Sequence, residues 1–184
     1  MRTITAGLFI SLDGVVEAPQ NWHFPYLNDE MQAEVGAQML AADTMLLGRH
    51  TYEEFAGHWA TQGSEVPFAD QINGIPKLVA SRTLSSVTWQ NSRLIDGDVA
   101  TELRSLKAGP GRNIAISGSP TLVRHLLEQD LLDELHLLVH PLIVGKGLRL
   151  FPDGTNSIPL ELIDSATFTT GVLNLTYRRS GDKH

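Results

Sequence analysis

Hydrophobic and polar residues along the chain follow two spacings, and these predict strands that alternate with helices. Residues 3–12 alternate between two sides that are both fairly apolar, which is typical of a central strand. After Asp13-Gly14 breaks this pattern, apolar residues recur at helical spacing over residues 29–42. Asn28 stands directly before them and acidic residues fill the first turn, so we predict a helix capped by Asn28.

The same two spacings continue toward the carboxyl end. Thr51 and Glu54 form a capping-box pattern, and Pro120 stands at the first position of another helix with Ser119 as its cap. The polar, glycine-containing residues 61–74 are predicted to form a loop. A further helix is predicted from about Val99 to its stop at Gly109, and strands are predicted at residues 44–47, 77–80, 87–89, 113–117, 135–140, 160–163 and 172–177.

The order of these elements predicts the fold class. Helices alternate with strands in the first part of the chain, which favours a parallel sheet covered by helices. Residues 160–163 and 172–177 are separated by too few residues for a crossover helix, so they are expected to pair antiparallel. We therefore predict an α/β fold of three layers with a mixed, mainly parallel sheet, in a single domain over residues 1–184.

Composition and charge narrow the classes of partner. Lys+Arg and Asp+Glu counts of 14 and 21 give a net charge of 14 − 21 = −7, which argues against a nucleic-acid or anionic-membrane surface. A hydrophobic fraction of 42% with 19% charged residues is typical of a globular chain. The absence of cysteine excludes disulfides, thiolate nucleophiles and cysteine-ligated metals. With no secretory signal pattern at the start, we expect a cytoplasmic protein without a membrane span.

Standard catalytic and metal-binding motifs are missing from the sequence. There is no G-x-G-x-x-G after a strand, no P-loop, no H-E-x-x-H and no G-x-S-x-G. His136 and His140 lie on one predicted strand, where four residues span roughly 13 Å, too far to share one metal ion. We therefore expect no metal site and assign these two histidines a structural or interface role.

Three predicted strands end in residues suited to phosphate binding. These ends are residues 48–51, 81–83 and 118–121, and they would lie at the same edge of a parallel sheet, where helix N termini point backbone N–H groups outward. Arg49 and Arg82 each follow a strand directly, and the planar guanidinium matches a phosphate group. The pattern favours NADPH over NADH. The alternative is that the glycines only form turns and the arginines are only solvated.

Two stretches at these ends resemble a known family. Residues 45–53, MLLGRHTYE, and residues 78–84, LVASRTL, resemble the cofactor-binding junctions of dihydrofolate reductase. Residues 10–14, ISLDG, and residues 133–151 resemble the C-terminal reductase domain of the riboflavin-biosynthesis enzyme RibD, which shares the dihydrofolate reductase fold. The resemblance implies an NADPH-dependent reductase of a small nitrogen heterocycle, of the pterin or aminopyrimidine type. A homodimer is also implied, and the alternating residues 135–139 are a candidate interface.

The resemblance also implies roles for individual residues. Asp29 or Glu30 would supply a proton, and Asp13 would begin the loop over the nicotinamide. Phe55 stands where the riboflavin enzyme has an aspartate for the substrate ribose, and Ser119 replaces the second glycine of a Gly-Gly pair. Apart from the resemblance, the aromatic rings of Trp22 and Phe24 are candidates to line the substrate pocket together with Phe55, the alternative being that such rings pack in the core. The residues implied to bind the cofactor are Ala6, Gly48, Arg49, His50, Thr51, Ser81, Arg82, Gly118, Ser119, Thr121 and Leu122.

Two functions from different classes fit this sequence. The first is an NADPH-dependent reductase like 5-amino-6-(5-phosphoribosylamino)uracil reductase or dihydrofolate reductase. The second is a non-catalytic NADP-binding or regulatory protein that retains the reductase fold. Hydride transfer to a heterocyclic substrate distinguishes the two.

Overall fold

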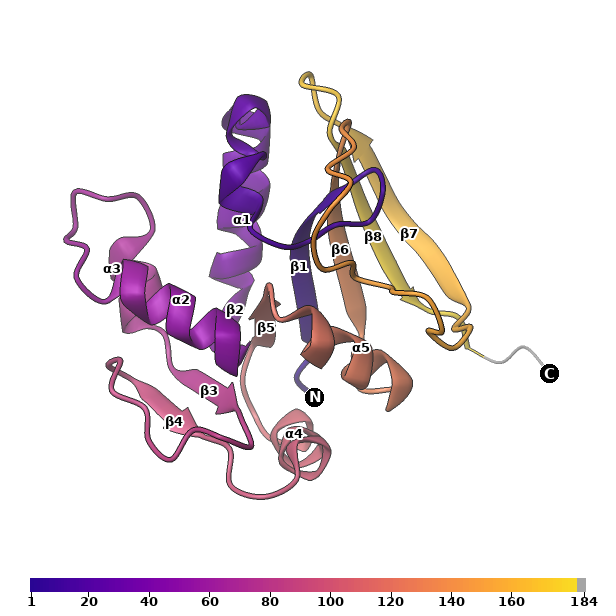
Figure 1. Cartoon of the computed structure of the whole chain (residues 1–184). Coiled ribbons are helices and arrows are strands. Elements are labelled where there is room, and N and C mark those ends of the chain that lie inside the picture. Colours follow the sequence, from indigo (N-terminus) through magenta and orange to yellow (C-terminus); the bar gives the residue numbers. More distant parts are fainter. Residues whose placement is uncertain (182–184) are drawn as a thin grey trace.

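The computed structural model describes residues 1–181, which form one sheet of eight strands with helices on both faces (Figure 1). Two 3-10 turns, Pro19–Asn21 and Phe24–Tyr26, lie between β1 and α1. The helices are α1 (Asp29–Ala41), α2 (Arg49–Trp59), α3 (Ala69–Gly74), α4 (Val99–Ala108) and α5 (Pro120–Glu128). The strands are β1 (Ile4–Ser11), β2 (Ala42–Gly48), β3 (Lys77–Ala80), β4 (Ser92–Leu94), β5 (Asn113–Ser117), β6 (Glu134–His140), β7 (Leu160–Thr167) and β8 (Leu173–Arg179).

The strand order in the sheet is β4-β3-β2-β5-β1-β6-β8-β7. Strands β1 to β6 all run parallel, and β8 pairs antiparallel with both β6 and β7. Helices lie in the connections between the parallel strands except that between β3 and β4, which is a loop, and β7 and β8 are joined by a short turn that leaves no room for a helix. The predicted mixed, mainly parallel sheet with an antiparallel C-terminal pair is confirmed.

Apolar side chains on both faces of the sheet define the three layers. On one face, Leu103 of α4 and Leu126 of α5 pack with Ile4 and Ile114 of the central strands in the largest buried cluster. On the other face, α1, α2 and α3 cover the sheet through two smaller clusters. The central strand β1 is buried on both faces, as its doubly apolar pattern predicts.

Two of the predicted elements are wrong, and the predicted caps of two helices are absent. The expected strand at residues 87–89 is a loop in which Trp89 is buried, and the edge strand β4 comes later. The loop expected at residues 61–74 contains helix α3. Helix α2 begins at Arg49 rather than Thr51, and neither α2 nor α5 has a side-chain cap, although Thr51 and Ser119 were expected to provide them. The cap of α1 is confirmed, since Asn28 accepts a hydrogen bond from Met31 N at 3.0 Å.

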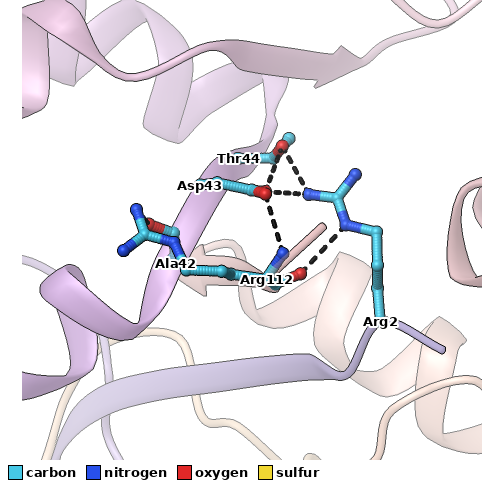
Figure 2. A network of polar contacts seen from close by, with 5 residues as sticks. All are labelled: Arg2, Ala42, Asp43, Thr44 and Arg112. Carbon is cyan, nitrogen blue, oxygen red and sulfur yellow. Dashed lines mark hydrogen bonds and ion pairs between the residues drawn. The ribbon is translucent and has the colours of Figure 1, made fainter. Parts of the chain in front are cut away.

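A buried arginine ties three strands together at the amino edge of the sheet (Figure 2). Arg2 is 8% exposed; its Nη2 pairs with Asp43 and donates to Thr44 Oγ1 at 2.7 Å, while its Nε donates to Arg112 O at 2.9 Å. Arg112 N in turn donates to Asp43 Oδ2 at 2.8 Å. These bonds fix the starts of β1, β2 and β5 relative to one another, so the opposite ends of the same strands are also held in register.

Strand β6 lies inside the sheet, between β1 and β8. The expected use of residues 135–139 as a dimer interface is therefore wrong, because this strand is covered on both edges and three of its leucines are buried. The edge strand β7 instead exposes Leu162 and Ile163. The homodimer itself stays a prediction.

Candidate functional site

The ends of three neighbouring parallel strands bring the predicted phosphate-binding residues together. Gly48 at the end of β2 pairs with Ala80 at the end of β3, so the residues that follow, Arg49 and Ser81, start side by side. On the other side of β2, Leu46 pairs with Ile116 of β5, which places Gly48 next to Gly118. The predicted gathering of residues 48–51, 81–83 and 118–121 at one edge of the sheet is thus present in the structure.

Ser119 joins two of these strand ends directly. Its Oγ accepts a hydrogen bond from Gly48 N at 2.9 Å, and its own N donates to Thr51 Oγ1 at 3.0 Å. Ser119 and Gly118 both have positive φ, +54° and +63°. For a residue with a side chain, the left-handed conformation costs about 1–2 kcal/mol, which the two hydrogen bonds of Ser119 offset.

Helices α2 and α5, which follow β2 and β5 at this edge, differ from α1 and α4 in their first turns. Helices α1 and α4 begin with a capping side chain and an acidic residue in the first turn. Helices α2 and α5 have no side-chain cap and no acidic residue there. Their first N–H groups and the positive end of each helix dipole therefore remain available to an anion. Two such helix starts on neighbouring strands fit a ligand with two linked phosphates.

The basic residues at the edge are exposed. Arg49 is 37% exposed in its side chain and pairs with Glu53 Oε2 at 3.1 Å, an i,i+4 pair that contributes little in water. His50 Nε2 lies 2.9 Å from Arg49 Nη2. Arg82 is exposed, and no carboxylate among residues 1–181 pairs with it. Both guanidinium groups are therefore free to turn toward a phosphate.

The other residues assigned to the cofactor lie around this edge in supporting positions. Ser81 Oγ accepts from Thr83 N at 3.1 Å and Leu84 N at 3.0 Å, which shapes the turn after β3. Thr121 is exposed and its Oγ1 accepts from Arg124, whereas Leu122 packs against the core. Ala6 differs from these residues, because it is fully buried within β1, where it pairs with Ile116 of β5 and Leu135 of β6.

Two of the three predicted catalytic carboxylates hold loops together. Asp13 accepts from Ser11 Oγ at 2.6 Å, from Val144 N at 3.0 Å and from Gly145 N at 2.8 Å. These hydrogen bonds, led by that of Ser11, lower the pKa of Asp13 to about 2. At neutral pH Asp13 is therefore an ionised anchor between the β1 turn and residues 144–145.

Glu30 plays a similar part at the start of α1. Its Oε2 accepts from Thr169 Oγ1, Thr169 N and Asn28 Nδ2, each at 2.7 Å. The Thr169 hydrogen bonds lower the pKa of Glu30 and tie α1 to the turn between β7 and β8. Asp29 is exposed, and no side-chain hydrogen bond to it occurs among residues 1–181. Of the three carboxylates, Asp29 is the one whose side chain makes no hydrogen bond within residues 1–181.

The predicted substrate-pocket residues do not form one group. Trp22 and Phe24 lie in the segment between β1 and α1, and Trp22 packs edge-on against His140 with ring centroids 5.1 Å apart. Phe24 packs against His23 at 4.2 Å and is 58% exposed. Phe55 instead packs among the apolar residues between α2, α3 and the sheet. The structure therefore separates Phe55 from the aromatic residues near β1.

Two buried histidines complete this aromatic cluster, and sequence reasoning missed one of them. His23 stacks on Phe9 with ring centroids 4.6 Å apart and lies 6.3 Å from His140. His140 Nδ1 donates to Leu138 O at 2.8 Å, while His140 Nε2 and His23 Nδ1 are buried without a hydrogen-bond partner. Burial lowers the pKa of both histidines. The signal in the sequence that could have indicated a buried His23 is its position between two aromatic residues, Trp22 and Phe24.

His136 is held within the sheet, in keeping with a structural role. Thr176 Oγ1 lies 3.1 Å from His136 Nδ1, across the β6–β8 pair, and Glu134 Oε2 lies 3.2 Å from His136 Nε2. Within residues 1–181, no three side chains of ligand type are close enough to hold a metal ion. None of the helices in the same residues is both long and apolar enough to cross a membrane.

The buried histidines predict a pH dependence of stability. Because burial lowers their folded pKa below the unfolded value, the unfolded state binds more protons at acid pH. Their contribution is complete above about pH 6.5 and is lost as the pH falls below that value. We expect His140→Leu to lose less stability than the wild type between about pH 7.5 and about pH 5.5. Urea unfolding midpoints at the two pH values measure this, and exposed His58→Gln is the control; equal losses in all three proteins contradict it.

Comparisons with known proteins agree with this fold. The sequence model described as the RibD C-terminal domain matches residues 2–174. The uncharacterized protein YyaP of Bacillus subtilis strain 168 is 26% identical over 183 residues, which cover 98% of this chain and 96% of that protein. YwjB of the same organism, also described as uncharacterized, is 28% identical over 166 residues, covering 89% of this chain and 90% of YwjB.

Solved structures extend the likeness to two groups of protein. A putative riboflavin biosynthesis protein from Shewanella sp. PV-4 superposes with a TM-score of 0.79 at 22% identity, covering 97% of this chain and 99% of that one. Dihydrofolate reductase from Enterococcus faecalis in complex with NADP(H) superposes with a TM-score of 0.66 at 15% identity, covering 97% of each chain. At these identities the likeness shows a shared dihydrofolate-reductase-like fold.

Proposed function

Because the chain belongs to the RibD C-terminal domain family, we propose that it is a reductase that transfers hydride from NADPH to a small nitrogen heterocycle. The observation that carries this proposal is the pair of uncapped helix starts, those of α2 and α5, on neighbouring strands. No acidic residue occupies either first turn, so the N–H groups there suit the two phosphates of a dinucleotide. The family and the fold are of the reductase type.

The residues at this edge fit the cofactor. The first backbone N–H groups of α2, from Arg49 to Thr51, and those of α5, at Thr121 and Leu122, would hold the two phosphates. Arg49, whose side chain is partly exposed, and Arg82, which is exposed, follow β2 and β3 at the same edge and would bind the additional phosphate that distinguishes NADPH from NADH. When bound, the nicotinamide supplies the hydride, and the protein supplies position and electrostatics.

Among the candidate carboxylates, Asp29 suits proton delivery best. Asp13 and Glu30 use their carboxylate oxygens to accept hydrogen bonds that hold loops, and these bonds lower the pKa of each group. Asp29 lies in the first turn of α1 and keeps its carboxylate exposed, where it can hold a water or a substrate nitrogen. We therefore assign the proton that accompanies hydride transfer to Asp29, directly or through a water.

Phe55 bears on the substrate. It packs inside the apolar cluster beneath α2, so its position offers no hydrogen bond to a ribose or a phosphate. A pterin or a pyrimidine without a phosphoribosyl group fits this chain better than the phosphoribosyl substrate of riboflavin biosynthesis. Trp22 and Phe24, on the segment between β1 and α1, would pack against a flat ring of the substrate.

Titration with NADPH and with NADH tests the cofactor, and tryptophan fluorescence can follow it. We expect sub-millimolar binding of NADPH and weaker binding of NADH; binding of neither would refute the proposal. Oxidation of bound NADPH is then measured across a panel of pterins, pyrimidines and flavins. Binding without any oxidation would favour the alternative, a non-catalytic NADP-binding protein.

A further inference from the structure

Ser119 and Thr51 link the ends of β5 and β2 by two hydrogen bonds that run in opposite directions. Gly48 N donates to Ser119 Oγ at 2.9 Å, and Ser119 N donates to Thr51 Oγ1 at 3.0 Å. Ser119 is 5% exposed and Thr51 is 8% exposed, so water competes little for these bonds. Since Gly48 precedes α2 and Ser119 precedes α5, neither helix start can shift alone without breaking a bond.

We propose that this interlock, formed by Gly48, Thr51 and Ser119, is a positioning device for the cofactor. It holds the N termini of α2 and α5 at a fixed separation in the ligand-free protein. A diphosphate can then bind to the N–H groups of both helices, which are already ordered. Binding to a preorganised site avoids the entropy cost of fixing loops. The inference rests on the proposed function, because the diphosphate is that of the dinucleotide.

The side chain of Ser119 is essential to this inference. A glycine would adopt φ +54° without strain, yet it could not accept the hydrogen bond from Gly48 N. Serine at this position therefore combines a strained left-handed backbone with the hydrogen bond from Gly48 N that glycine could not accept. Gly118 has a left-handed φ of +63°, and an added Cβ would stand 3.3 Å from both Thr51 Cγ2 and Thr51 Oγ1, so that Thr51 would have to shift by a few tenths of an ångström.

The variants Ser119→Ala and Ser119→Gly distinguish the effect of the lost hydrogen bond to Ser119 Oγ from the effect of backbone strain at residue 119. Both remove the hydroxyl, but only Ser119→Gly also relieves the left-handed backbone. We expect both to weaken NADPH binding about five- to tenfold, the loss of one buried hydrogen bond. Thr51→Val, which loses the acceptor for Ser119 N, should show a similar loss, while Thr51→Ser should stay within about twofold of the wild type.

A second readout does not depend on the cofactor. Amide hydrogen exchange in the ligand-free protein should be at least about tenfold faster at Gly48 in both Ser119 variants, because its N–H loses its acceptor. Asp130→Gly is the matched control, since Asp130 has φ +55° at the opposite end of α5 and its replacement relieves similar strain away from the edge. This control should leave both NADPH affinity and Gly48 exchange unchanged.

The outcomes distinguish the two proposals. If Ser119→Gly binds NADPH as well as the wild type or better, the backbone alone matters and the interlock is refuted. Unchanged exchange at Gly48 in both Ser119 variants would also refute it. If the wild type binds neither NADPH nor NADH, the proposed function fails, whereas the exchange measurement still decides whether the link fixes the two helix starts.

Discussion

Lys77→Met should lower the free energy of unfolding by about 3–5 kcal/mol, a larger loss than any surface substitution is expected to cause. Lys77 is 1% exposed, and its ammonium donates to the carbonyls of Asn73 at 3.0 Å, Ile75 at 2.9 Å and Gln90 at 3.2 Å. Methionine keeps the length of the side chain but leaves these partly buried carbonyls without their charged donor. Urea unfolding measures the loss.

Control variants make this result specific. Lys146 is exposed in the loop after β6, so Lys146→Met should change stability by less than about 0.5 kcal/mol. Lys77→Gln retains a shorter N–H donor and should fall between the wild type and Lys77→Met, which keeps the test informative if Lys77→Met does not fold. Burial lowers the pKa of Lys77 to about 8, so the amine stays largely protonated at neutral pH. A loss below about 1 kcal/mol for Lys77→Met would contradict the assigned role.

The same buried lysine explains where the sequence prediction failed. The expected loop at residues 61–74 contains α3, and the expected strand at residues 87–89 is a turn around buried Trp89. Both segments are shaped by bonds to Lys77 and Asn73: Trp89 Nε1 donates to Asn73 Oδ1 at 2.7 Å, and Lys77 Nζ lies 4.2 Å from the Trp89 ring centroid. Such long-range polar contacts leave no periodic pattern in the sequence.

The elements with regular patterns were predicted well, because their hydrophobic spacing reports burial directly. The first strand was expected at residues 3–12 and is β1, Ile4–Ser11, buried on both faces. The antiparallel pairing of β7 and β8 was predicted from the length of their connection alone, because so few residues cannot form the crossover that parallel strands need. Caps were predictable where the side chain is local, as at Asn28, and not where Ser119 bonds to a residue from another strand.

The strand ends that form the candidate site could be predicted from the sequence, but the hydrogen-bond partners of its carboxylates could not. Glycine and arginine after buried strands indicated the candidate phosphate-binding edge, and the register of β2 with β3 and β5 places those residues together. Sequence could not show that Asp13 and Glu30 are held by Ser11 and Thr169, because these bonds depend on how the loops fold back. The function of a carboxylate depends on such contacts as much as on its position in the chain.

Arg82→Gln should weaken NADPH binding about tenfold, or about 1.4 kcal/mol, and leave NADH binding nearly unchanged. Arg82 lies two residues after the end of β3, is exposed, and has no carboxylate partner among residues 1–181, so its guanidinium is free to form two hydrogen bonds with the extra phosphate of NADPH. Glutamine retains part of the length and polarity but neither the charge nor the planar fork. Fluorescence titration with both cofactors measures the change.

Arg49 should add to this discrimination. Its pair with Glu53 is solvent-exposed, so breaking it to reach a phosphate costs little. The double variant Arg49→Gln/Arg82→Gln should therefore bind NADPH and NADH with nearly equal affinity, and the steep salt dependence expected for NADPH should fall to that of NADH. Arg93→Gln, at an exposed arginine of β4 that pairs with Glu102, is the matched control and should alter neither affinity. Equal losses for both cofactors in Arg82→Gln would mean that Arg82 acts on the shared part of the dinucleotide, and the preference for NADPH would then need another source than these two arginines.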